Sequence, residues 1–319
     1  MKKQIRYAVD IKKLNKTFIN KKKDEKILAL VNVSLQIPKG SLFGLLGLNG
    51  AGKSTIINIL AGLCLKNSGA VKINNYDIDT NRKQASCQIG IVPQELNFDP
   101  FFTPKEILEV QAGLYGIKKK DRKTKQILQD LDLYSKANSY TRSLSGGMKR
   151  RLMIAKALVH DPSILVLDEP TAGVDIETRR AMWNFLRKIN RNGTTIILTT
   201  HYLEEAEQLC NQLAIIDDGE IVENDSMYNV LTKVKLEVFV LNLDQSIDAV
   251  PEIEDYFIEI TNPKEIEVHV KQAQTLNPVF EKLASLGIGV LSMRNKTNRL
   301  EELFIELTRA ESNIGVTIE

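Results

Sequence analysis

The strongest chemical pattern in the sequence is the glycine-rich stretch GLNGAGKST at residues 47–55, the phosphate loop. Gly47, Gly52, Lys53 and Ser54 satisfy the spacing G-x-x-x-x-G-K-S/T. Glycines let a backbone fold tightly and direct its N–H groups at phosphate oxygens. The lysine would reach the β- and γ-phosphates of a nucleotide, and the serine hydroxyl would ligate Mg²⁺. A glycine-rich turn that merely carries a lysine is the alternative.

Two adjacent carboxylates, Asp168 and Glu169, end the apolar run ILVLDEP. Asp168 suits the Mg²⁺ shell, and Glu169 could orient or deprotonate an attacking water. Successive strand residues point to opposite faces, so a continuing strand could not aim both carboxylates at the metal. We expect Pro170 to end the strand and to let Glu169 turn toward the nucleotide. A pair that only caps the strand exit is the alternative, which an upstream phosphate loop disfavours.

Two single residues also stand at the ends of apolar runs. Gln94 follows IVP and could contact Mg²⁺ or its water from a movable loop. His201 follows TTIILTT and could donate a hydrogen bond to a γ-phosphate. Taken alone, they read as a surface glutamine and a structural histidine. Together with the other patterns they predict functional roles.

The stretch LSGGMKRR at residues 144–151, whose LSGG we call the signature, has no carboxylate, histidine or cysteine. It could hold a ligand but supplies no acid, base or metal ligand. The helix that follows opens with three basic residues, Lys149, Arg150 and Arg151. Because cations are disfavoured at a helix N-terminus, we expect these side chains to contact solvent or an interface, not phosphate.

Apolar runs predict the strands that position these residues. Residues 33–37 alternate in polarity, as a half-buried strand does. Residues 42–46 form a more buried strand directly before the phosphate loop. Residues 164–167 and 195–199 are short and apolar, typical of strands buried on both faces of a parallel sheet. Ligands of such sheets bind beyond the carboxyl ends of the strands, where the acidic pair stands.

Helices and a second domain complete the predicted fold. An apolar helix is expected at residues 56–63, and residues 103–133 have a helical, lysine-rich pattern that Gly116 or Asp121 could break. Asp218-Gly219 predicts a hairpin turn. Beyond residue 227 we predict strands at 237–243, 256–260, 265–270 and 290–293, and helices at 277–286 and 299–308. We place a domain boundary near residues 231–235, which gives domains at 1–231 and 235–319.

Composition limits the class of protein. The chain has 319 residues and a net charge of +3, which is too weak to indicate a nucleic-acid surface. Its three cysteines show no metal spacing, and an odd count without a secretory signal fits a reducing compartment. No apolar run approaches the length of a bilayer span, so we expect a chain that is soluble by itself. If it works at a membrane, a separate partner must supply the membrane part. Lysines crowd residues 12–26 and predict a solvated hairpin loop, with anionic headgroup contact as the alternative.

The patterns occur in the chain order GLNGAGKST, Gln94, LSGGMKRR, ILVLDEP, AGVD and His201. That order resembles the nucleotide-binding subunit of ABC transporters over about residues 5–231. Many phosphate-loop enzymes have the loop and the acidic strand, but LSGG before ILVLDEP is specific to the ABC class. LSGGMKRRL, DEPTAGVD and LTTHYLEEAE resemble the ATPases of ABC-2 type exporters. The C-terminal residues resemble a small α+β accessory domain that follows some of them.

The resemblance implies an α/β fold, a P-loop NTPase with an antiparallel N-terminal β-subdomain, a RecA-like core and a helical subdomain at about residues 100–160. It implies ATP and Mg²⁺ as cofactors. Phe18 stands where the family more often has an adenine-stacking tyrosine, and Leu48 where it usually has proline. Catalytic roles are implied for Glu169, His201 and Gln94, and metal binding for Ser54, Asp168 and Gln94. The residues implied to bind ATP are Phe18, Gly47, Asn49, Gly50, Gly52, Lys53, Ser54, Thr55, Ser145, Gly146, Gly147 and Asp175.

The implied function is ATP hydrolysis that drives an exporter, on the cytoplasmic side of the plasma (inner) membrane. Two subunits would sandwich two ATP molecules, each between one phosphate loop and the other subunit's signature. LSGG would then lack catalytic groups because it is half of a site. Asp175 resembles the residue that crosses the dimer interface. The partners are a second cassette, identical or a paralogue, and a separate integral membrane permease that the Gln94 loop would contact; no nucleic acid is expected.

Two other functions are consistent with a phosphate loop. A soluble ABC ATPase acting on ribosomes or DNA usually has two cassettes or long insertions, whereas this chain has one cassette and a near-neutral charge. A nucleotide-binding regulatory module without turnover is the second alternative. The presence of Glu169 argues against it.

Overall fold

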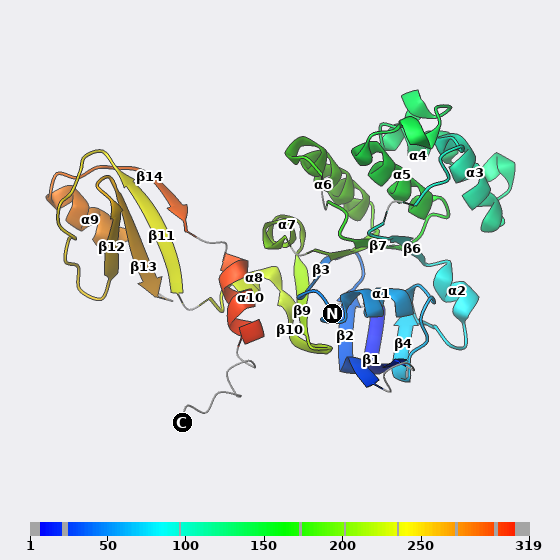
Figure 1. Cartoon of the computed structure of the whole chain (residues 1–319), viewed down its shortest axis with the longest axis horizontal. Coiled ribbons are helices and arrows are strands. Elements are labelled where there is room, and N and C mark those ends of the chain that lie inside the picture. The colour runs from blue at the N-terminus through cyan, green and yellow to red at the C-terminus, as the bar shows by residue number, and fades with distance from the viewer. Residues whose placement is uncertain are drawn as a thin grey trace, which may run out of the picture. The chain divides into compact units, whose positions relative to one another are not determined.

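The computed structural model of the chain (Figure 1) describes residues 7–20, 25–95, 97–171, 174–200, 202–234, 236–271, 274–296 and 299–309. It divides into two compact units, Met1–Ser226 and Met227–Glu319. The sequence placed the boundary a few residues later, near 231–235. The difference is the helix α8 (Met227–Leu231), which packs against α10 (Arg299–Arg309) and so belongs to the second unit.

An antiparallel sheet opens the first unit, with the strand order β2-β1-β4-β5. Its strands are β1 (Tyr7–Asn20), β2 (Glu25–Pro38), β4 (Ser68–Ile73) and β5 (Tyr76–Asp77). The strand predicted at residues 33–37 is the buried half of the longer β2, which pairs along the whole of β1 through several bulges. The loop prediction was wrong for Lys12, Lys13, Lys16 and Lys26, which lie within these strands; residues 21–23 lie outside the described residues.

The second sheet of this unit has the order β10-β9-β3-β8-β7-β6, and only β10 is antiparallel to its neighbour. Its strands are β3 (Leu42–Leu46), β6 (Ile89–Val92), β7 (Ile164–Asp168), β8 (Thr195–Thr199), β9 (Gln212–Asp217) and β10 (Glu220–Ser226). β3 and β8 are buried at every residue, as their apolar runs predicted. The carboxyl ends of β3, β8, β7 and β6 therefore lie side by side along one edge.

Seven α-helices pack on and beside these sheets in the described part of the first unit. They are α1 (Lys53–Leu60), α2 (Arg82–Ser86), α3 (Pro104–Leu114), α4 (Thr124–Asp130), α5 (Gly146–Leu158), α6 (Ile176–Arg191) and α7 (Leu203–Leu209). Short 3₁₀ turns are η1 (Lys119–Asp121), η2 (Tyr134–Lys136) and η3 (Thr141–Ser143). Among the described residues, no helix combines the length and apolar character that a bilayer crossing requires.

Local sequence explains where the key helices begin and end. The helix predicted at 56–63 begins earlier, at Lys53, because Gly52 takes the cap position, and it ends before Gly62 at φ 71°. Thr103 and Glu106 form a reciprocal capping box at the start of α3, worth about 1 kcal/mol. The long helical stretch breaks at Gly116, which has φ 73°. Contacts among α3, α4 and α5 join them into one helical lobe (Figure 1).

The second unit is a four-stranded antiparallel sheet with the order β12-β13-β11-β14. Its elements are β11 (Leu236–Leu243), β12 (Phe257–Asn262), β13 (Glu265–Lys271), α9 (Asn277–Ser285) and β14 (Val290–Asn295), with α8 and α10 beside them. Alternate strand residues such as Ile266 and Val268 pack against Val279 and Leu283 of α9. The strands and helices predicted beyond residue 227 are present, in the α+β arrangement that the resemblance implied.

Candidate active site

The phosphate loop lies between β3 and α1, and its shape depends on glycine at two positions. A Cβ atom at Gly47 would lie 2.4 Å from the backbone oxygen of Ile216. At Gly52 it would lie 2.8 Å from the backbone oxygen of Ala29, at a φ of +112°. Any other residue at either position would push the loop away from the sheet. The packing of these two glycines against neighbouring backbone therefore sets the tight conformation of the loop.

Lys53 is folded back over this loop. Its Nζ donates hydrogen bonds to the backbone oxygens of Gly47 at 2.7 Å and Leu48 at 3.0 Å. Burial lowers the pKa of Lys53, and the nearby carboxylates of Glu169 and Asp168 counteract this by raising it. The structure thus places the lysine, buried to all but 6% of its surface, in the electrostatic field of the acidic pair.

Asp168 and Glu169 lie at the carboxyl end of β7, beside the end of β8. The register pairs Asp168 with Thr199, and the Thr199 hydroxyl donates to Asp168 Oδ1. The backbone N–H of Glu169 donates to both oxygens of Thr199, at 3.1 Å to its carbonyl and 3.2 Å to its hydroxyl. Sequence reasoning missed Thr199. Thr199 could have been found from its position at the end of an apolar strand, which pairs in parallel with the strand that ends at the acidic pair.

Glu169 leaves the strand through a left-handed backbone conformation with φ 47°. This conformation breaks the alternation of faces that would have kept the two carboxylates apart. Gln94, just beyond β6, donates from Nε2 to Glu169 Oε2 at 2.9 Å. The structure therefore brings together three of the predicted residues, Gln94, Asp168 and Glu169, with Lys53 close to the acidic pair.

The expectation that Arg150 faces solvent or an interface was wrong. Its side chain is only 4% exposed, and its Nη1 donates to the backbone oxygens of Pro93 at 3.1 Å and Gln94 at 3.0 Å. Burial lowers its pKa, and Asp168 and Glu169 raise it. Arg150 lies on the same face of α5 as buried Ile154 and Ala157, at spacings of four and seven residues. That spacing in the sequence could have predicted that its side chain is buried.

The signature starts α5, in the helical lobe. Ser145 is the N-cap, and its exposed side chain accepts a hydrogen bond from the Met148 N–H at 3.3 Å. Gly146 borders open space, whereas a Cβ at Gly147 would lie 2.8 Å from Thr178 Cγ2 in the first turn of α6. Thr178 also donates its N–H to Asp175 at 2.8 Å. The signature and Asp175 are thus neighbours within one chain.

Other predicted residues fall around this arrangement. Asn49, Gly50 and Ser54 are exposed, and Thr55 is half-buried, at the loop and the first turn of α1. Hydrogen bonds from the backbone of Thr178 hold the pKa of Asp175 below its ordinary value. Phe18 lies on β1 with its ring 41% exposed and Lys16 Nζ 4.7 Å from the ring centroid. His201, with residues 172–173, lies outside the described residues.

The residues at this sheet edge fit a triphosphate and a divalent cation. A loop that admits no Cβ at Gly47 or Gly52, a buried ammonium group and the start of a helix form an anion-binding cradle. The carboxylate of Asp168, fixed by Thr199, is an oxygen ligand of the kind Mg²⁺ prefers. Glu169 is held by Gln94 and Thr199 in a position separate from that of Asp168. The arrangement can therefore separate metal binding from proton transfer.

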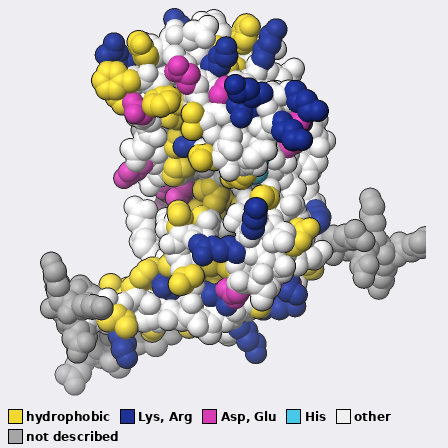
Figure 2. Space-filling model, turned by 90° about the vertical axis from the view of Figure 1, so that its right-hand side faces the viewer, with side chains coloured by type: hydrophobic (Ala, Val, Ile, Leu, Met, Phe, Trp, Pro, Cys, Tyr) yellow, Lys and Arg dark blue, Asp and Glu magenta, His cyan; other side chains and the backbone are white. Residues whose placement is uncertain are grey.

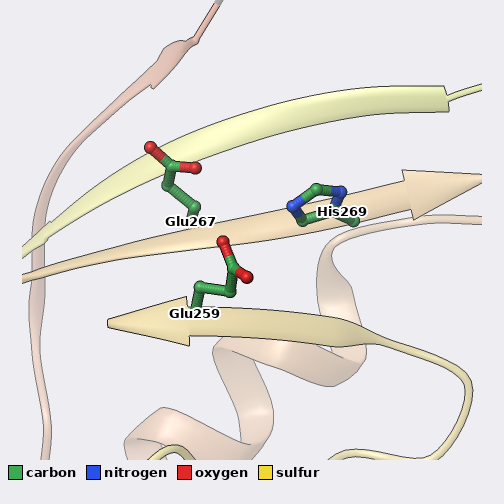
Figure 3. Close-up of side chains that lie close together, drawn as sticks. All are labelled: Glu259, Glu267 and His269. Carbon is green, nitrogen blue, oxygen red and sulfur yellow. The ribbon is translucent and has the colours of Figure 1, made fainter. Parts of the chain in front are cut away.

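A second group of ionisable side chains lies on the sheet of the other unit (Figure 3). Glu259, Glu267 and His269 each offer one atom that could bind a metal, within 4.8 Å of one another. Glu259 and Glu267 pair directly across the strands, where like charges repel. Lys296 Nζ lies 2.6 Å from Glu267 Oε2, and the Phe257 ring meets His269 edge-on. The lysine thus already supplies a positive charge at this group.

Known proteins that match this chain share the region containing the phosphate loop, the signature and the acidic pair. The family model described as ABC transporter matches residues 30–172. Nod factor export ATP-binding protein I of Burkholderia pseudomallei (strain 1710b) is 34% identical over 307 residues, which are 92% of this chain and 96% of that protein. Linearmycin resistance ATP-binding protein LnrL of Bacillus subtilis (strain 168) is 32% identical over 289 residues, 86% of this chain and 92% of that protein.

Solved structures resemble the first unit. The dimeric post-hydrolysis state of the ATP-binding cassette MJ0796, bound to ADP and Pi, is 30% identical, with a TM-score of 0.61, covering 69% of this chain and 98% of that one. An ATP-binding subunit of an ABC transporter is 26% identical, with a TM-score of 0.63, covering 71% of this chain and 92% of that one. Both coverages leave about the length of the second unit outside the match.

Proposed function

The chain belongs to the ATP-binding proteins of ABC transporters, and on that premise we propose that it is the ATP-hydrolysing subunit of an ABC-2 type exporter. The observation that carries the proposal is the meeting of Lys53, Asp168 and Glu169 at one sheet edge, with an intact signature on a separate lobe. The relatives named for Nod factor export and linearmycin resistance support the exporter class.

Hydrolysis would depend on how this chain holds its side chains. Lys53 would exchange its two loop carbonyls for phosphate oxygens, and Ser54 and Asp168 would hold Mg²⁺. When bound, Mg²⁺ neutralises charge that develops on the phosphates. Glu169, kept in place by Gln94 and Thr199, would accept the proton of the attacking water. Phe18 would stack on adenine, and His201 would contact the γ-phosphate.

We propose that two cassettes close on two ATP molecules. Ser145 and the N–H groups of Gly146 and Gly147 are exposed or half-buried at the start of a helix, so they can meet a phosphate carried by another subunit. The dimeric MJ0796 cassette supports this arrangement. Asp175, exposed at the start of α6, would reach across the same interface. Loss of the γ-phosphate would open the dimer.

A test of the loop that carries Gln94 is Arg150→Met. The backbone oxygens of Pro93 and Gln94 lose their buried donor, so we expect the free energy of unfolding to fall by about 1–3 kcal/mol. ATP turnover should fall more than ATP affinity, because Gln94 loses its support beside Glu169. Denaturant unfolding and phosphate release measure the two effects. Arg151→Met, whose arginine bonds Leu131 instead, should lower stability without this loss of turnover.

A groove of about 350 Å³ beside the Gln94 loop is our candidate for contact with the membrane subunit. It is lined by residues including Leu63, Pro93, Tyr115 and His160, and hydrophobic side chains gather in a hollow across the face shown in Figure 2. The rings of Tyr115 and His160 stack 3.9 Å apart. Pro93 lines the groove and directly precedes Gln94, whose side chain donates to Glu169. A partner bound in the groove would therefore contact the chain one residue away from Gln94.

The groove predicts the outcome of an affinity purification from detergent-solubilised membranes. The chain should retain an integral membrane protein, consistent with a peripheral site on the cytoplasmic side of the inner membrane. Leu63→Asp, at a side chain that is 80% exposed, should reduce this recovery about tenfold because a carboxylate would be buried against apolar surface. Leu286→Asp in the second unit is the matched control. Equal recovery with both variants would exclude the groove as the contact.

We propose that the cassette ends with the compact unit at Ser226, and that residues 227–319 form the α+β accessory domain. The sheet of β11 to β14 has its own buried core with α9, which supports an independent domain. The first unit contains the phosphate loop, the acidic pair and the signature. ATP chemistry would therefore reside in the first unit alone.

A further inference from the structure

Glu205 is a buried carboxylate that the ATP chemistry does not use. It lies on α7 and is only 1% exposed. Its Oε1 accepts hydrogen bonds from the Thr171 hydroxyl at 2.8 Å and from Trp183 Nε1 at 3.0 Å. Its Oε2 has no hydrogen-bond partner among the described residues. A carboxylate is costly to bury with so few partners, and apolar packing alone would not require one here.

The two donors lie on either side of Asp175 in the chain. Thr171 is two residues after Glu169 and is itself 1% exposed. Trp183 lies on α6, two turns after Asp175 at its N-cap. β7 ends at Asp168, Thr171 follows in the connection, and Asp175 caps the start of α6. One oxygen atom of Glu205 therefore joins Thr171, before Asp175 in the chain, to the second turn of α6, after it.

The helix that supplies Glu205 follows directly from another part of the site. β8 carries Thr199, which bonds both Asp168 and Glu169, and α7 begins four residues later. Its N-terminal end is joined to the sheet edge through the backbone N–H of Tyr202, which donates to the Thr200 hydroxyl at 3.0 Å. A displacement at the end of β8 is thus passed to α7, and through Glu205 to Thr171 and Trp183.

We propose that Glu205 is a positioning residue that couples the γ-phosphate end of β8 to the segment carrying Asp175, and so links the two ATP sites of the dimer. The inference rests on the proposed function, in which Asp175 crosses the dimer interface. Among the described residues, the hydrogen bonds of the Glu205 side chain go to Thr171 and Trp183, not to the phosphate loop or to Glu169. Glu205 acts through the position of the β7–α6 connection, so its loss should change cooperativity between sites and turnover, while each phosphate loop still binds ATP.

The test compares Glu205→Ala, Glu205→Gln and the control Glu204→Ala in the purified full-length chain. Glu204 is exposed on the same helix and carries the same charge. In Glu205→Ala we expect kcat to fall about tenfold, equal to about 1.4 kcal/mol in activation free energy, and the Hill coefficient for ATP to fall to 1. Binding of a fluorescent ATP analogue by the monomer should stay at the wild-type level. The glutamine amide oxygen can accept from both donors, so Glu205→Gln should recover most of the cooperativity.

Thr171→Val provides a second readout if the alanine variant folds poorly, because it removes one donor and keeps the side-chain shape. It should lower the Hill coefficient while keeping the melting temperature within a few degrees of wild type. Wild-type cooperativity in Glu205→Ala or in Thr171→Val would overturn the inference and leave the proposed function intact. Hyperbolic kinetics and no ATP-dependent dimer in the wild-type chain would overturn the proposed function, and the inference with it.

Discussion

Replacing Glu169 with glutamine should lower ATP turnover by about a hundredfold to ten-thousandfold, the usual contribution of a positioned general base. The amide has the shape of the carboxylate, and its oxygen can still accept from Gln94, while the backbone N–H of residue 169 keeps its bonds to Thr199. The amide cannot accept the proton of the attacking water. ATP affinity should therefore change little, because Lys53 and Asp168 keep their places.

The variant should also collect in the closed state. If hydrolysis opens the dimer, a chain that binds ATP without cleaving it should elute as an ATP-bound dimer on a sizing column. Phosphate release and elution volume are the two measurements. Glu220→Gln, which changes an exposed carboxylate near the β9–β10 turn, is the control and should behave as wild type. Wild-type turnover in Glu169→Gln would remove Glu169 from its catalytic role.

Ser145→Arg should abolish ATP-dependent dimer formation while each monomer binds ATP normally. Ser145 is exposed at the start of α5, so an arginine can be accommodated in the single chain, but it would fill the space that a partner's γ-phosphate needs. Loss of the N-cap bond to Met148 costs about 1 kcal/mol, which is too small to unfold the domain. Turnover should fall to background. Ser143→Arg, two residues earlier and also exposed, is the matched control.

A mixing experiment separates a shared site from a site within one chain. Ser145→Arg chains keep their phosphate loop, and Lys53→Met chains keep their signature. If the two parts meet across an interface, a mixture should contain dimers with one intact site, and ATP trapping should return to about half of the wild-type level per dimer. If the signature served its own chain's phosphate loop, each variant would be inactive alone and the mixture would be inactive too.

The parts of the fold that the sequence predicted are those governed by local patterns. The strands at residues 42–46 and 195–199 have their expected bounds, because these short, largely apolar runs end at turns or polar residues. The first turn of α1 was not expected to be helical because Lys53, Ser54 and Thr55 are polar. Their helical conformation follows from the Gly52 cap, a feature of the loop itself.

The contacts that complete the site were beyond local patterns. Pro170 was expected to free Glu169 from the strand, but the left-handed conformation belongs to Glu169 itself and is held by Thr199 on the neighbouring strand. Arg150 was assigned by its position near a helix start, whereas its orientation is decided by the carbonyls of residues 93 and 94. Each contact joins segments more than 25 residues apart, so only the folded chain reveals it.

The backbone conformation of Glu169 also lowers the thermal stability of this protein. A left-handed conformation costs about 1–2 kcal/mol in any residue that has a Cβ atom, and here it is adopted by the residue that we propose as the general base. Glycine or asparagine would adopt this conformation at lower cost, and on the proposed function either would remove the general base. On the proposed function, this conformational cost is kept for the sake of turnover, so stabilising changes are better sought far from the carboxyl end of β7.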